Sequence, residues 1–132
     1  MEMMPRHPSI KGPAEWFTGD VYIQPIANGV DPSRIQVNAV HFTPGARTAW
    51  HAHGLGQTLW VTEGVGRIQS RGEELHEIRA GDILYTPAGE EHWHGAASDG
   101  FMTHISMTER TSDRPDEWGD HVSDAEYGGS RG

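Results

Sequence analysis

The segment that decides the fold spans residues 50–61 and reads WHAHGLGQTLWV. In an extended strand, side chains two positions apart point to the same side, so His51 and His53 share one face and stand close enough to bind one ion. After a glycine-containing turn, Gln57 is in phase with the apolar side chains of the next strand. A polar amide on an otherwise apolar inner face needs a partner, and a metal ion is one. This stretch therefore predicts β-structure with metal ligands on the inward face.

The His-x-His spacing returns at His92-Trp93-His94, near the other end of the chain. A single pair of this kind is most often two hydrogen-bonded or partly exposed histidines. Two pairs on different strands, each after a turn with glycine and proline, are a stronger signal, because a small barrel brings its inward faces together. The pattern predicts one divalent transition metal on His51, His53, Gln57 and His92. Ligand type alone leaves manganese, iron, nickel and zinc open.

The rest of the chain predicts an all-β fold, because short alternating segments bounded by Gly, Pro, Asn and Asp recur along it. Strands are expected at residues 20–26, 35–42, 49–53, 58–63, 66–71, 75–78, 83–85, 92–96 and 101–108. No interdomain linker separates them, so residues 1–132 are expected to form one domain with a barrel core at about 20–110. The N-terminal arm and the acidic tail after about Arg110 are expected to be flexible or packed on the surface. Trp118 and Tyr127 indicate that part of the tail docks.

Composition and charge limit the possible functions. The 132 residues include no cysteine and carry a formal net charge of −9. Thiolate chemistry is therefore excluded, and a nucleic-acid partner, which needs clustered Lys and Arg, is not expected. No apolar run approaches the length of a membrane span, and the first residues lack the apolar region of a secretory signal. We therefore expect no membrane partner and a cytoplasmic location.

The glycine and histidine spacings resemble the two motifs of the cupin superfamily. Gly45, His51, His53, Gln57 and Gly64 follow G(X)5HXH(X)3-4E(X)6G, and Gly81, Pro87, Gly89 and His92 follow G(X)5PXG(X)2H(X)3N. The resemblance implies a single-domain cupin, an antiparallel jelly-roll β-barrel. The chain departs from the motifs at Gln57, which replaces the glutamate, and at Ala96, which replaces the asparagine. A shell of three histidines and a glutamine is neutral, which makes a divalent ion a stronger Lewis acid and favours non-redox chemistry over oxygenase chemistry.

A closer resemblance extends over nearly the whole chain. Segments 11–19, 44–50, 55–59, 89–97 and 102–104, with the tail around 121–122, are similar to the manganese-dependent cupin hydroxynitrile lyases of bacteria. The resemblance implies Mn(II) on the four ligands, with His94 and His104 beside the metal as proton-transfer groups. The predicted substrate cavity is lined by Asn38, Val40, Leu59, Val61, Met102 and Thr108.

The predicted function is a metal-dependent lyase that cleaves a cyanohydrin, a small-molecule substrate, to an aldehyde or ketone plus cyanide. His94 or His104 would take the hydroxyl proton, and an ordinary imidazole pKa near 6.5 predicts weaker activity below about pH 6. Three alternatives remain open. They are a metal-dependent dioxygenase, a sugar-acid isomerase or lyase, which the scarcity of inward-facing Arg and Lys disfavours, and a non-catalytic small-molecule-binding cupin.

The remaining aromatic and charged residues predict how the surface is used. Trp50, Trp60 and Trp93 are out of phase with the neighbouring ligands, which predicts a second packed layer or a subunit interface. We therefore expect a homo-oligomer, either a dimer or a tetramer. Arg47 and the acidic tail are expected to be ordinary surface, and His7 is expected to be exposed to solvent.

Overall fold

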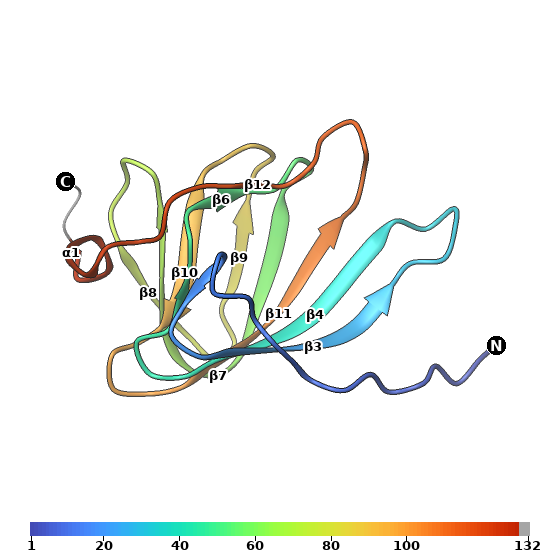
Figure 1. The fold of residues 1–132 in the computed structure, drawn as a ribbon, viewed down its shortest axis with the longest axis horizontal. Coiled ribbons are helices and arrows are strands. Elements are labelled where there is room, and N and C mark those ends of the chain that lie inside the picture. Colours follow the sequence, from blue (N-terminus) through green and yellow to red (C-terminus); the bar gives the residue numbers. More distant parts are fainter. Residues whose placement is uncertain (130–132) are drawn as a thin grey trace.

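The protein is an all-β domain, as the sequence predicts. The computed structural model describes residues 1–129. Its elements are β1 (Ile10–Lys11), β2 (Phe17–Thr18), β3 (Val21–Asn28), β4 (Ile35–Phe42), β5 (Arg47–Thr48), β6 (His51–Ala52), β7 (Gln57–Ser70), β8 (His76–Arg79), β9 (Ile83–Thr86), β10 (His92–Ala96), β11 (Met102–Glu109), β12 (Glu117–Trp118) and the helix α1 (Asp124–Tyr127). Figure 1 shows the strands as a strongly curled sheet, with the N-terminal arm extending from one end and α1 at the other.

Strand β7 joins the two halves of the curled sheet. Its first part pairs antiparallel with β11 and β9, beside β4, β3 and β1, and its second part pairs with β10 and β8, beside β5 and β2. The strand bends at Gly64, where φ is +77° and a Cβ atom would lie 1.9 Å from the carbonyl oxygen of Phe101. Only glycine fits such an approach. The prediction of separate strands at 58–63 and 66–71 is therefore wrong, because the chain bends there without leaving the sheet.

Two hydrophobic clusters hold the domain together. The main cluster lies inside the curled sheet and contains Phe17, Val21, Val40, Phe42, Ala46, Leu59, Val61, Ile68, Ile78, Ala96 and Met102. The second cluster contains Trp50, Trp93, Val122 and Tyr127. The second cluster thus joins barrel strands to the tail, and the folded unit extends beyond the predicted barrel limit near residue 110.

Arg47 anchors the tail, and its prediction as ordinary surface is wrong. Its side chain is buried and donates hydrogen bonds to the carbonyl of Val122 at 2.8 Å and to Asp124 Oδ1 at 2.9 Å. The guanidinium also lies 4.6 Å from the centre of the Tyr127 ring, and Arg67 contacts the same ring at 4.5 Å. A buried guanidinium is tolerated only when it is paired in this way.

Trp60, Ile83 and Tyr85 form an exposed apolar row on the outside of the sheet. Their exposed fractions are 49%, 69% and 68%, and Trp60 is the antiparallel partner of Ile83 on the next strand. Trp60 was predicted to belong to a second packed layer or to a subunit interface. Its exposure within this chain leaves the interface, which stays a prediction.

No helix among residues 1–129 is long and apolar enough to span a membrane.

Candidate metal centre and adjoining cavity

Three histidines converge where β6 and β10 pair. One ring nitrogen from each of His51, His53 and His92 lies within 4.8 Å of the others, and all three side chains are buried. Burial lowers the pKa of His92 to about 4 and holds the pKa of His51 well below its usual value. Both rings are therefore neutral near pH 7, which is the form that binds a metal ion.

Contacts at Nδ1 set the orientation of each ring. His51 and His92 direct Nδ1 at the backbone carbonyl two residues earlier, at 2.9 and 3.0 Å. His53 Nδ1 lies 3.0 Å from Asp116 Oδ1, an ion-pair distance, but makes no hydrogen bond. The Nε2 atom of His53 is buried and has no hydrogen-bond partner. An unpartnered buried nitrogen is unfavourable by itself, and a metal ion bound among the three rings would satisfy it, so the donor set fits the predicted metal.

Gln57 completes the predicted ligand set at the start of β7. Its side chain is buried, its Nε2 donates to Ser106 Oγ at 2.9 Å, and its Oε1 lies 3.0 Å from His92 Nε2. The hydrogen bond to Ser106 fixes the amide so that its oxygen, the atom that binds metal ions, points toward the histidines. Its role as a fourth ligand stays a prediction.

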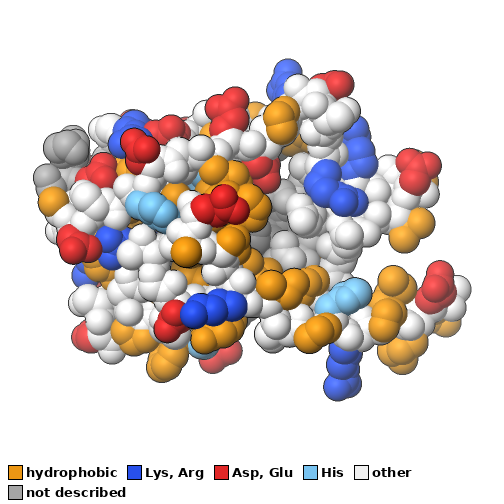
Figure 2. Space-filling model, in the orientation of Figure 1, with side chains coloured by type: hydrophobic (Ala, Val, Ile, Leu, Met, Phe, Trp, Pro, Cys, Tyr) orange, Lys and Arg blue, Asp and Glu red, His pale blue; other side chains and the backbone are white. Residues whose placement is uncertain are grey.

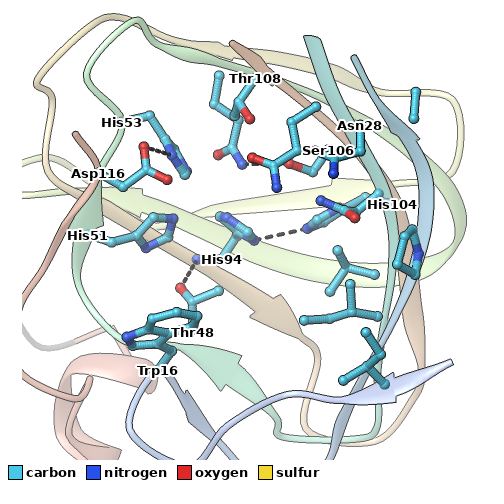
Figure 3. A pocket seen from close by; sticks show the side chains of 18 of the residues that line it. Trp16, Asn28, Thr48, His51, His53, His94, His104, Ser106, Thr108 and Asp116 are labelled. Atoms are coloured by element: carbon cyan, nitrogen blue, oxygen red, sulfur yellow. Dashed lines mark hydrogen bonds and ion pairs between the residues drawn. The ribbon is translucent and has the colours of Figure 1, made fainter. Parts of the chain in front are cut away.

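A second histidine pair lies beside the first group. His94 Nδ1 and His104 Nε2 are 3.0 Å apart, and the His94 ring centre is 5.2 Å from that of His51 (Figure 3). Burial lowers the pKa of His104 to about 3 and holds the pKa of His94 well below its usual value. The His104 ring therefore stays neutral well below pH 6, and burial favours the neutral form of His94 as well. The expectation that activity weakens below about pH 6 assumed ordinary imidazoles, and burial removes its basis.

A cavity of about 630 Å³, within the usual range for small-molecule sites, is lined by His51, His53, His94 and His104, whereas His92 is not among its lining residues. Figure 2 shows the hollow opening on one face, with hydrophobic side chains along its rim. Three of the predicted lining residues, Asn38, Val40 and Thr108, lie in its wall. The other three, Leu59, Val61 and Met102, are completely buried in the main cluster and are not among the lining residues. Strand phase gave their inward direction correctly, but these side chains pack against one another instead of facing the cavity.

Residues outside the predicted barrel core also build the cavity wall. Trp118 stacks on His51, with ring centres 4.6 Å apart, and on Trp16, with ring centres 4.9 Å apart. Both tryptophans, together with Asp116 and His7, line the cavity. None of these four residues is predicted at the site from the sequence. Trp118 stood out only as an aromatic residue in an acidic stretch, and His7, although exposed, lies at the cavity edge.

The cupin domain family matches residues 38–107, the segment that contains the three histidines and Gln57. This chain is a cupin. It is 49% identical over 117 residues, 89% of each chain, to a protein of Granulicella tundricola named (R)-mandelonitrile lyase. Its structure is similar to that of a cupin-like protein from Thermotoga maritima, with a TM-score of 0.86 and 37% identity over 96% of this chain and 95% of that chain.

A more distant structure shares only the fold with this cupin. It is a cupin 2 conserved barrel domain protein from Rhodopseudomonas palustris, with a TM-score of 0.69 and 18% identity over 83% of this chain and 74% of that chain. Together these comparisons confirm the predicted cupin fold and the resemblance to hydroxynitrile lyases. The fold and the three-histidine group support metal binding.

Proposed function

We propose that this cupin is a metal-dependent lyase that cleaves cyanohydrins reversibly to an aldehyde or ketone and cyanide. The observation that carries the proposal is that the hydrogen-bonded pair His94–His104 lines the same cavity as His51 and His53 of the three-histidine group. The relative named (R)-mandelonitrile lyase supports the substrate class. A divalent ion, with Mn(II) favoured by the family resemblance, would be held by the three histidines and Gln57, where it would supply Lewis acidity that lowers the pKa of a substrate hydroxyl.

The histidine pair is arranged to accept one proton and to donate another. Because both rings are neutral, they carry two protons, and one of these lies in the 3.0 Å hydrogen bond between His94 Nδ1 and His104 Nε2. The outer nitrogens, His94 Nε2 and His104 Nδ1, have no hydrogen-bond partner among residues 1–129. In either tautomer one outer nitrogen is bare and the other carries a proton. The pair therefore always holds one bare outer nitrogen that could accept a proton.

The reaction balances with this pair alone as the proton carrier. The bare outer nitrogen takes the hydroxyl proton, the oxygen forms the carbonyl group, and the carbon–carbon bond to the nitrile breaks with its electrons leaving on cyanide. The imidazolium that results holds its added proton weakly, because burial lowers the pKa of both rings. It therefore passes its proton readily to the departing cyanide, which leaves as hydrogen cyanide, and the pair returns to its neutral state.

The cavity wall fits an aryl or alkyl group on the carbonyl carbon. Trp16, Trp118 and Val40 present apolar surface near the histidines, and the stacked indoles leave a flat wall for an aromatic ring. In this cavity, substrate binding therefore relies on apolar contact and on the polar histidine groups.

The test is benzaldehyde release from mandelonitrile at pH 5 to 6, where spontaneous decay of the cyanohydrin is slow. The metal-loaded protein should release benzaldehyde faster than the metal-free protein. The variants His94→Ala and His104→Ala should lose this activity while they keep their metal. His41→Ala is the matched control, because His41 bonds to Thr103 Oγ1 and is not among the cavity-lining residues. A loaded rate no higher than that of the metal-free protein would overturn the proposal. Oxygen consumption with bound iron would instead support the dioxygenase alternative.

A further inference from the structure

The members of the three-histidine group differ in the oxygen atom that lies at Nδ1. His51 and His92 have a neutral backbone carbonyl of their own strand region at Nδ1. His53 instead faces a carboxylate, Asp116 Oδ1 at 3.0 Å, from a segment far away in the sequence (Figure 3). A carboxylate that accepts a hydrogen bond from a ligating histidine fixes the ring and makes its other nitrogen a stronger donor. Asp116 makes no such bond in this structure, but 3.0 Å is close enough for it to form when the Nδ1 proton is directed at Oδ1. We propose that Asp116 is a positioning residue that orients His53 and supplies the negative charge that the Gln57 shell lacks.

The tail is built to bring Asp116 to this position. Strand β12 pairs with β6, so that Trp118 lies opposite His51 and Glu117 opposite Ala52. At Gly54 the backbone of the tail crosses so closely that a Cβ atom would lie 1.8 Å from the carbonyl oxygen of Arg114. Glycine at this position therefore allows the tail to lie directly over the turn that carries His53. Asp116 sits between these two fixed contacts.

The contact between Asp116 and His53 also brings a negative charge to the predicted metal site. Three imidazoles and an amide are all neutral, so a divalent ion among them would keep two uncompensated positive charges. Among residues 1–129, Asp116 is the carboxylate in ion-pair contact with one of these rings. Glu90 also acts electrostatically on His92, but its side chain accepts a hydrogen bond from Ser70. With Nε2 of His53 on the metal, the ring proton must lie on Nδ1, opposite Asp116 Oδ1. The Asp116 side chain is 43% exposed, which weakens its effect by solvent screening but does not abolish it.

The test is metal affinity, measured by titration of the metal-free protein with Mn²⁺. Asp116→Asn keeps the shape and removes the charge, and it should weaken binding about 10- to 100-fold. Asp113→Asn is the matched control, because it removes the same charge from the same segment without touching a ligand, and its affinity should stay within twofold of the wild type. The spectrum of bound Co²⁺, which reports ligand geometry, should change in Asp116→Asn and stay unchanged in Asp113→Asn.

A double-mutant cycle separates a role in charge from a role in holding the tail. Gln57→Glu places a negative charge directly on the ligand set, so Asp116→Asn should cost much less affinity in that background. Equal losses in both backgrounds, or equal affinities of Asp116→Asn and Asp113→Asn, would overturn the inference. The inference rests on the metal binding of the proposed function and not on cyanohydrin cleavage. A wild type that binds no Mn²⁺ would refute that metal binding, whereas tight binding without lyase activity would refute only the reaction.

Discussion

Burial of the histidine pair makes the stability of the metal-free protein depend on pH. In the unfolded chain the imidazole of His104 has a pKa near 6.5, whereas burial lowers it to about 3 in the folded protein. Between these values the unfolded chain binds a proton that the folded protein does not, so the free energy of unfolding falls as the pH falls. From pH 7 to pH 5, His104 alone should remove about 2 kcal/mol. His94 acts in the same direction, because burial lowers its pKa as well.

The variant His104→Gln removes one of these titrating rings while keeping a polar side chain. Its loss of unfolding free energy between pH 7 and pH 5 should be smaller than that of the wild type by about 2 kcal/mol. Urea unfolding of metal-free protein, followed by tryptophan fluorescence, measures this difference. His76→Gln is the control, because His76 is exposed on β8 and its replacement should leave the pH dependence unchanged. Equal losses in His104→Gln and the wild type would refute the assignment of a buried neutral ring.

Three further predictions concern the metal, the cavity wall and the outer face. His92→Ala should retain less than about a tenth of an equivalent of metal by elemental analysis while its circular dichroism stays that of the wild type, since the core is apolar. Trp118→Ala should lower the free energy of unfolding by about 1–2 kcal/mol, because it removes two ring stacks, and should raise KM for an aryl cyanohydrin more than for an alkyl one. If the apolar row on β7 and β9 joins two copies of the chain, Trp60→Glu should reduce the mass measured by light scattering to that of a monomer, whereas a wild type that is itself monomeric would contradict the predicted homo-oligomer.

The central part of the site could be predicted because it depends on local periodicity. Alternation along a strand places His51 with His53, and it places His92 with His94, whatever the rest of the chain does. Strand β4 has the predicted bounds, Ile35–Phe42, for the same reason. A barrel then brings such faces together without further information.

Features that depend on distant contacts could not be predicted. Arg47 looks like a surface residue until Asp124 and the carbonyl of Val122 are seen to satisfy its charge. Nothing in the acidic tail distinguishes Asp116, which contacts His53, from Asp113, which does not. Strand phase indicates which face of the sheet a side chain lies on, but not whether it reaches the cavity. For this reason Leu59 was expected at the cavity but lies in the core.

The residues that line the site of this cupin come from two separate parts of the chain. The three histidines and Gln57 lie on barrel strands and the turns between them. Asp116 and Trp118 lie on a short strap that Arg47 and Tyr127 hold in place from outside the cavity. Because the anchor and the cavity wall are different residues, substitutions in the strap can alter which molecules the metal centre receives while the barrel keeps its structure. Both natural divergence and laboratory evolution of new specificities should therefore find their starting points in the cavity-lining residues of this strap.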